Sequence, residues 1–204
     1  MADLEKQDKP DLEVQDIKIE KPVDGKKKHN AAREITEWLV SIIIAVALAL
    51  VIHNNVFQII KVEGPSMQQT LWTGERMFVT PFSYMKNQPE RGDIVVTNFP
   101  NDSRHFVKRV IGLEGDVVEV SEGSVYINGI VLIEEYLFED IRKQMAPVTV
   151  SKDAVFVMGD NRNNSSDSRM PNVGEIDEAL IIGKVQGIVF PFSEYEWFED
   201  VVYD

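Results

Sequence analysis

The 204-residue sequence contains no cysteine and only three histidines. The absence of cysteine excludes disulfide bonds, thiolate nucleophiles and zinc sites built from cysteine. The histidines, His29, His53 and His105, are too scattered along the chain to suggest a histidine metal cluster. We therefore expect no metal site in this protein.

Basic residues are also scarce. Lysine and arginine total 21 against 34 aspartates and glutamates, which gives a formal net charge of -13. Proteins that bind nucleic acid need a basic face that displaces counterions from phosphates. The charge balance therefore argues against a nucleic-acid partner. The hydrophobic fraction of 44% is sufficient for the packed core of one domain with appendages.

The N-terminal region lacks large apolar residues. Residues 1–30 alternate acidic and basic side chains, a composition that cannot bury enough surface to become ordered. We expect residues 1–34 to form a disordered cytoplasmic tail. Its last part is basic and contains Lys26, Lys27, Lys28 and Arg33.

One long apolar run follows this basic cluster. Its core, WLVSIIIAVALALVI, begins at Trp38, and the residues after it extend the run less purely. The length predicts one transmembrane helix over residues 35–60, in contact with a lipid bilayer. The basic flank predicts a cytoplasmic N-terminus and an extracytoplasmic C-terminal domain. The alternatives are a cleavable secretory signal, which the length of the run and of the tail disfavours, and a buried soluble helix.

Beyond residue 60, helical periodicity is scarce and short β-prone runs dominate. The Asn128-Gly129 pair between two such runs predicts a tight hairpin, because its turn needs positive φ at both central residues. Residues 134–144 and 175–180 are expected to form short helical turns. We therefore predict a mainly β, antiparallel domain over residues 61–204. The predicted strands are RMFVT, GDIVVTNF, HFVKRVIGL, DVVEV, SVYI, IVLI, DAVFVMG and KVQGIVF.

Ser66 is the candidate nucleophile. It lies in KVEGPSMQQTL, residues 61–71, directly after a Gly-Pro pair. A serine in such a place is commonly an ordinary turn residue. Two further polar stretches need explanation, however: HFVKRVIGLEGD at residues 105–116 and GDNRNNSSDSR at residues 159–169. Their presence in one small chain suggests that Ser66 works together with residues from both.

The base for Ser66 is expected to be a lysine. A Ser-His-Asp hydrolase would have to use His105, and the G-x-S-x-G pattern of α/β-hydrolases is missing around Ser66. A neutral lysine can replace histidine in this role. Lys108 lies among apolar residues, where burial could lower its pKa from ~10.4 by roughly 3 units. Strand alternation would place Phe106 on the same face as Lys108. The alternative interpretation is an exposed strand lysine.

The loop GDNRNNSSDSR does not have the spacing of a calcium-binding EF-hand. Ser165 occupies the position where that motif requires glycine, and no glutamate closes the loop. Two interpretations remain: an ordinary polar surface loop, or a buried network that fixes the loop and orients the lysine. In the network, Asp160 and Asp167 would pair with Arg162, Arg169 or Arg109, and Ser165 or Ser168 would donate to the neutral amine.

The motifs VEGPSMQQTL, RGDIVV, KRVIGLEGD and GDNRNNSSDSR, in this order behind one apolar run, resemble those of bacterial type I signal peptidases, also called leader peptidases, of the small Gram-positive kind. The resemblance extends from the run to about Gly187. It implies an antiparallel β-sheet catalytic domain of signal-peptidase type. It also implies a membrane-anchored serine endopeptidase that removes signal peptides from exported preproteins through an acyl-enzyme, without metal or cofactor.

The resemblance also assigns individual roles. Ser66 matches the family's nucleophile, Lys108 its general base and Ser165 the serine that orients the lysine amine. Two ion pairs are expected to support the site: Asp160 with Arg109, and Asp167 with Arg169.

The oxyanion would be held by the backbone N–H of Ser66. Some members of the family have a side-chain donor two residues earlier, where this chain has Gly64, which offers none. The substrate would lie extended beside residues 60–64 and 105–108. Ordinary core packing is the alternative role for the predicted pocket residues, which are Ile60, Val62, Met67, Phe106 and Val107.

Two positions depart from the family pattern, with Gln69 and Glu114 standing where proline is usual. Neither side chain is expected to touch a reacting atom, so the loss of proline should at most loosen a turn. Self-cleaving repressors of the DNA-damage type share the Ser-Lys pattern but should carry a DNA-binding domain instead of an apolar run. A non-catalytic assembly chaperone, for example for pili, is disfavoured because both Ser66 and Lys108 are present.

Overall fold

The computed structural model describes residues 31–55, 57–84, 87–100, 102–199, 201 and 203. The tail predicted for residues 1–34 therefore lies mostly outside the described residues. The chain divides into two compact units, with the boundary between Ile42 and Ile43. The domain limits predicted from the sequence, 1–34, 35–60 and 61–204, stay a prediction.

Helix α1 extends from Ala31 to Asn55 and covers most of the stretch 35–60 that was predicted to be helical, whose last residues belong instead to strand β1 (Gln58–Lys61). Near its start, Arg33 Nε lies 2.8 Å from Glu37 Oε1, one helical turn further on. Among the residues that the structure describes, no helix is both long enough and apolar enough to cross a membrane. The predicted transmembrane helix is therefore not confirmed.

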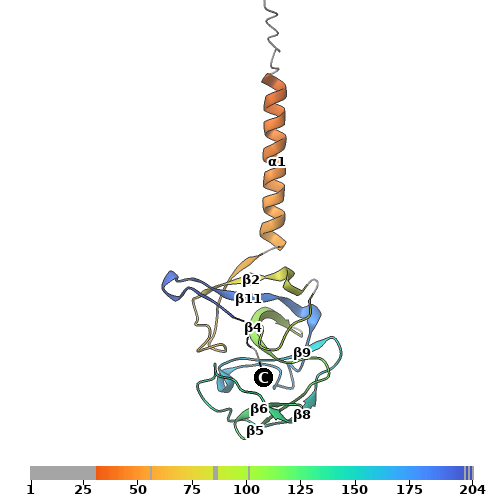
Figure 1. Ribbon diagram of the computed structural model, residues 1–204, viewed down its shortest axis with the longest axis vertical. Coiled ribbons are helices and arrows are strands. Elements are labelled where there is room, and N and C mark those ends of the chain that lie inside the picture. Colours follow the sequence, from red (N-terminus) through yellow and green to blue (C-terminus); the bar gives the residue numbers. More distant parts are fainter. Residues whose placement is uncertain are drawn as a thin grey trace, which may run out of the picture. The chain divides into compact units, whose positions relative to one another are not determined.

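The rest of the chain is mainly antiparallel β structure, as predicted, and forms two sheets (Figure 1). The first has the order β1-β2-β11-β3-β4-β9-β10, with β12 also paired to β11, and the second has the order β7-β6-β5-β8. In Figure 1 the second sheet lies at the end of this β body opposite β2 and β11. The strands are β1 (Gln58–Lys61), β2 (Arg76–Thr80), β3 (Ile94–Phe99), β4 (Asp102–Gly112), β5 (Val117–Ser121), β6 (Ser124–Ile127), β7 (Ile130–Val131), β8 (Met145–Thr149), β9 (Ala154–Met158), β10 (Ile176–Asp177), β11 (Ile181–Phe190) and β12 (Glu196–Trp197). Four 3₁₀ helices accompany them: Pro81–Tyr84, Arg162–Asn164, Glu178–Leu180 and Phe192–Glu194.

Strand β9 is buried along its whole length because both of its faces are covered. Ala154, Phe156 and Met158 pack into the core that includes the second sheet, whereas Val155 and Val157 pack into a different cluster. This division follows the alternation of side chains along a strand. It makes β9 and its neighbour β4 rigid elements in the middle of the fold, next to the polar loop that follows β9.

The hairpin at Asn128-Gly129 is confirmed. Both residues have positive φ, 54° and 83°, and Ile127 faces Ile130 across the turn. The helical turn expected over residues 134–144 is wrong, since this stretch forms turns and bends before β8. Strand β8 itself was not predicted, because it is a largely exposed edge strand containing Pro147. In residues 175–180 a 3₁₀ helix forms only from Glu178, after the short strand β10.

Candidate active site

Ser66 and Lys108 come from different elements and meet at the end of a cleft. Ser66 lies in the turn after β1, and Lys108 lies in β4 between strands β3 and β9. Lys108 Nζ is 2.8 Å from Ser66 Oγ and donates to the carbonyl of Val107 at 2.9 Å. The distance between amine and hydroxyl is that of a hydrogen bond, so a proton can pass directly between them.

Lys108 is buried, with 2% of its surface exposed, so the interpretation of an exposed strand lysine is wrong. The rings of Phe99 and Phe106 stack with centroids 3.9 Å apart, and Lys108 Nζ lies 5.9 Å from each centroid. Phe106 and Lys108 thus share a face of β4, as the alternation predicted. Burial lowers the pKa of Lys108 from 10.5 to about 8, although the charges of Asp167 and Asp160 act in the opposite direction.

The turn that carries Ser66 is held by the loop after β9. The backbone N–H of Asn161 donates to the carbonyl of Ser66 at 3.0 Å, and its side-chain Nδ2 donates to the carbonyl of Pro65, also at 3.0 Å. Gly159 allows this close approach, because a Cβ there would lie 2.4 Å from the Ser66 carbonyl oxygen. No local pattern in the sequence points to Asn161, because both contacts are made to residues almost a hundred positions away along the chain.

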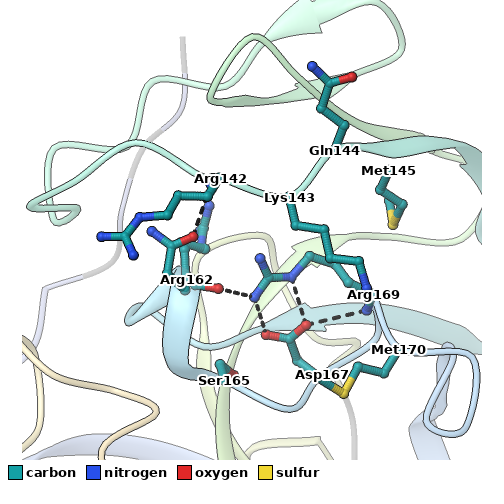
Figure 2. Close-up of a pocket in the computed structure, with 10 residues that line it drawn as sticks. Arg142, Lys143, Gln144, Met145, Arg162, Ser165, Asp167, Arg169 and Met170 are labelled. Atoms are coloured by element: carbon teal, nitrogen blue, oxygen red, sulfur yellow. Dashed lines mark hydrogen bonds and ion pairs between the residues drawn. The ribbon is translucent and has the colours of Figure 1, made fainter.

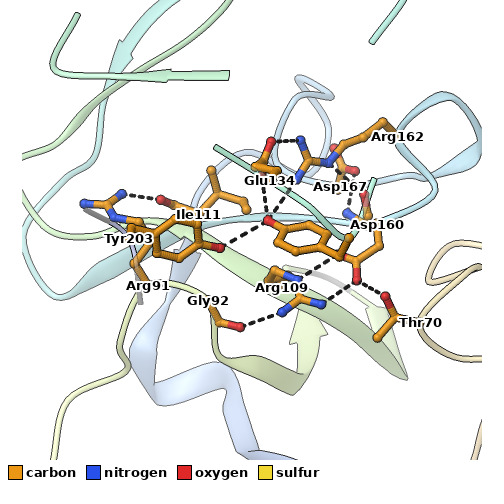
Figure 3. A network of polar contacts seen from close by, with 12 residues as sticks. Thr70, Arg91, Gly92, Arg109, Ile111, Glu134, Asp160, Arg162, Asp167 and Tyr203 are labelled. Carbon is orange, nitrogen blue, oxygen red and sulfur yellow. Dashed lines mark hydrogen bonds and ion pairs between the residues drawn. The ribbon is translucent and has the colours of Figure 1, made fainter. Parts of the chain in front are cut away.

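Asp160 and Arg109 form a buried, bidentate ion pair (Figure 3). Arg109 Nε lies 2.9 Å from Oδ1 of Asp160, and Nη2 lies 2.7 Å from Oδ2. Burial acts to lower the pKa of Arg109, but the adjacent carboxylate outweighs it, so the pKa is raised and the guanidinium stays charged. The hydroxyl of Thr70, a few residues after Ser66, donates to the same carboxylate at 2.5 Å. The pair therefore ties β4 to the turn of the nucleophile.

Arg162 does not pair with either aspartate of the loop. Its guanidinium binds the carboxylate of Glu134, with Nη1 2.6 Å from Oε2. The hydroxyl of Tyr136 also donates to Glu134, and the centre of the Tyr136 ring lies 3.9 Å from the guanidinium carbon of Arg109. This network was not predicted, because Glu134 and Tyr136 come from a stretch that was expected to be helical.

Asp167 is fully buried against Arg169 (Figure 2). Arg169 Nε and Nη2 each lie 2.8 Å from a different carboxylate oxygen, and the N–H of Gly159 donates to Oδ2 at 3.0 Å. Burial acts to raise the pKa of Asp167, but hydrogen bonds and the charge of Arg169 outweigh it and lower the pKa below its usual range. The carboxylate therefore stays ionised and keeps the loop in shape.

The structure does not bring Ser165 into a hydrogen bond with Lys108. Its hydroxyl is buried and makes no hydrogen bond of good geometry among the described residues, although it lies near enough to the Asp167 carboxylate to help lower the pKa of that group. The side chain turns instead toward Gly159, where a Cβ would lie 2.3 Å from Ser165 Oγ. Ser168, the alternative donor, is bound by the N–H of Val157 at 3.0 Å. The predicted contact with the lysine amine is therefore absent from this structure.

A cleft of about 430 Å³ leads to Ser66 and Lys108, between residues 60–64 on one side and 104–108 on the other. Gly64 is at its edge with φ 89°. The backbone N–H of Ser66 finds no acceptor in the part of the chain that the structure describes. The five residues expected to contact substrate all line this cleft: Ile60, Val62, Met67, Phe106 and Val107.

Comparison with known proteins gives a consistent result. A family model described as signal peptidase, peptidase S26, matches residues 35–190. A signal peptidase I of Bacillus licheniformis is 41% identical over 178 residues, which cover 82% of this chain and 95% of that protein. Signal peptidase I T of Bacillus subtilis strain 168 is 41% identical over 180 residues, which cover 83% and 91%. The crystal structure of a signal peptidase I from Enterococcus faecalis V583 is 32% identical, with a TM-score of 0.44, and the match covers 48% of this chain and 97% of that one. The chain therefore belongs to the signal peptidase family, peptidase S26.

Proposed function

We propose that this protein is a serine endopeptidase that removes N-terminal signal peptides from exported preproteins, with Ser66 as nucleophile and Lys108 as general base. The observation that carries the proposal is the buried Lys108 amine 2.8 Å from Ser66 Oγ, at the end of a cleft. Family membership and the name signal peptidase I of its relatives support the choice of substrate.

Acylation begins with neutral Lys108. Ser66 Oγ forms a bond to the scissile carbonyl carbon while its proton moves to Lys108 Nζ, and the carbonyl oxygen becomes an oxyanion. The carbonyl then re-forms as the bond to the leaving nitrogen breaks. That nitrogen takes the proton from Lys108 and departs as the N-terminus of the mature protein, which leaves the signal peptide esterified to Ser66.

Deacylation uses the same pair in reverse order. Water gives a proton to Lys108 Nζ and its oxygen bonds to the ester carbon. Collapse of the second tetrahedral intermediate expels Ser66 Oγ, which recovers the proton from Lys108. Each turnover therefore returns Lys108 to its neutral form, and the proton transfers between Ser66 and Lys108 occur across the 2.8 Å contact.

The cleft suits an extended peptide with small side chains. Val62 and Met67 line the cleft but are only 3% and 1% exposed and belong to the hydrophobic core, so a small side chain fits beside them better than a large one. Val107 and Phe106 form the opposite wall. We propose that these residues and Ile60 select small residues at the cleavage site, and that the Asp160 and Asp167 ion pairs support the geometry.

The location is part of the proposal. Basic residues before the apolar run predict anchoring in a bacterial cell membrane with the peptidase domain outside the cytoplasm. The test is alkaline extraction of membranes followed by external proteolysis of spheroplasts. Full release of the protein by alkali, or protection of the domain from the protease, would contradict this location.

The function is tested by incubating the purified full chain with a preprotein and sequencing the N-terminus of the product. We expect one cut after a small-x-small sequence. Because the neutral amine is the base, kcat/KM should rise about tenfold per pH unit below pH 8 and level off above it, following the pKa of Lys108 near 8. Circular dichroism at each pH checks that the protein stays folded. Failure of folded protein to cut at pH 9, or a rate independent of pH from 6 to 9, would refute the mechanism.

A further inference from the structure

The backbone of the Ser66 turn offers a donor for the oxyanion. Gly64 has no side chain to contribute, and the N–H of Ser66 has no acceptor among the described residues. Such a free backbone donor beside a nucleophile is the arrangement that binds a developing oxyanion. The direction and strength of this single N–H therefore matter more here than in a site with two donors.

The Ser66 N–H belongs to the peptide unit that also contains the carbonyl of Pro65. That carbonyl accepts two hydrogen bonds, one from Asn161 Nδ2 at 3.0 Å and one from the N–H of Gln68 at 3.2 Å. Since a peptide unit is planar, holding its oxygen also sets the direction of its N–H. A hydrogen bond to the carbonyl also polarises the unit and makes the N–H a better donor.

Asn161 is well suited to act on this unit. It is 7% exposed, and its own backbone N–H donates to the Ser66 carbonyl at 3.0 Å. It therefore holds the peptide units on both sides of the Ser66 α-carbon. Its neighbours are fixed in turn, because Asp160 pairs with Arg109 and the N–H of Gly159 donates to Asp167.

We propose that the Asn161 side chain is a positioning residue for the oxyanion, acting through the Pro65 carbonyl on the Ser66 N–H. The inference rests on the proposed acylation of Ser66. When Ser66 Oγ bonds to the carbonyl carbon and its proton passes to Lys108, the electron pair of the C=O bond moves to oxygen. Asn161 aims the N–H at that oxygen, so its contribution appears in the transition state and not in substrate binding.

The test uses the full chain with Asn161→Ala, which removes the side chain, and Asn161→Asp, which keeps its shape but has no N–H to donate. Asn163→Ala is the matched control, because Asn163 lies two residues away and binds the carbonyl of Asp140 and the N–H of Arg142, not the Ser66 turn. Both Asn161 variants should lower kcat roughly tenfold with KM within about twofold, against the ~10²- to 10³-fold loss for removal of an oxyanion donor itself. Asn163→Ala should match wild type.

A second readout separates positioning from general loosening. A peptide boronic acid forms a tetrahedral, negatively charged adduct on serine, so its inhibition constant should weaken by the same factor as kcat in both variants. Rates are compared at equal folded fraction, measured by circular dichroism, and Asn161→Ser, which keeps a shorter donor, should fall between wild type and Asn161→Ala. Unchanged kcat in both Asn161 variants, or a loss in KM alone, would overturn the inference. Full activity of Ser66→Ala would instead overturn the proposed function.

Discussion

Lys108→Met should abolish cleavage and at the same time stabilise the fold. Methionine has similar length but no amine, so Ser66 loses its base, and we expect kcat/KM to fall by ~10³-fold or more. Ser66→Ala should lose ~10⁴-fold or more, and the double variant should be no worse than Ser66→Ala, because the two residues act as one unit. Preprotein cleavage followed by mass spectrometry measures all three. Cleavage by either single variant within tenfold of wild type would exclude the dyad.

The gain in stability follows from the pKa of Lys108. Its pKa falls from 10.5 in the unfolded chain to about 8 in the fold, because burial disfavours the charged amine. Between these values the unfolded state binds more protons, so the stability of the wild type should rise with pH through this window. Below pH 8 the full penalty applies, about 3 kcal/mol for a shift of this size. Lys108→Met removes that penalty.

Urea unfolding at pH 7 and pH 10.5 measures this difference. At pH 7 the variant should be more stable than wild type by up to about 3 kcal/mol, less whatever the lost hydrogen bonds to Ser66 and Val107 contribute. The advantage should shrink toward pH 10.5, where the amine is neutral in the fold and half neutral in the unfolded chain. If the difference in unfolding free energy between variant and wild type were the same at both pH values, the pKa of Lys108 would not be lowered in the fold.

Gly159→Ala is the second substitution expected to have a large effect. The new Cβ would lie 2.4 Å from the carbonyl oxygen of Ser66 and 2.3 Å from Ser165 Oγ. Rotation of Ser165 would move its Oγ but not its Cβ, which would lie 2.7 Å away, and the carbonyl belongs to the nucleophile's own backbone, so the Ser66 turn must move. A displacement of ~1 Å is enough to cost ~10²-fold in rate. We expect a loss of this size, together with roughly 1–3 kcal/mol of stability from overpacking.

Gly187→Ala provides the matched control. Its Cβ would lie 2.2 Å from the carbonyl oxygen of Glu196, a clash of the same kind where β11 meets β12, and the atoms nearest to it belong to Glu196 and Trp197, not to Ser66. Both variants should unfold at lower urea, but only Gly159→Ala should lose activity per folded molecule. Equal specific activity in the two variants would mean that the Ser66 turn tolerates displacement, and the role assigned to Gly159 would be withdrawn.

Local patterns in the sequence account for much of the fold. Strands β2 to β6, β9 and β11 coincide with β-prone runs, and the Asn128-Gly129 turn needs only the φ preferences of its own residues. Strand β8 was not predicted because an exposed edge strand lacks a buried face, and its sequence therefore has no alternating pattern of apolar and polar residues. The prediction of a helical turn over residues 134–144 was wrong for a related reason. Glu134 is bound by Arg162, 28 residues away, and this contact cannot be read from the local sequence.

In the candidate site, too, some features follow from the local sequence and others only from the tertiary structure. The sequence by itself determined which residues to consider: Ser66 after its Gly-Pro pair, Lys108 among apolar neighbours, and the charged loop after β9. Alternation along β4 also determined that Lys108 shares a face with Phe106. Only the tertiary structure decided that this face is buried, that Ser66 meets it from 42 residues away, and that the side chain of Asn161 binds the Ser66 turn. The physical reason is that periodicity sets the direction of a side chain within its own element, whereas its partners and its pKa depend on which distant elements pack against it.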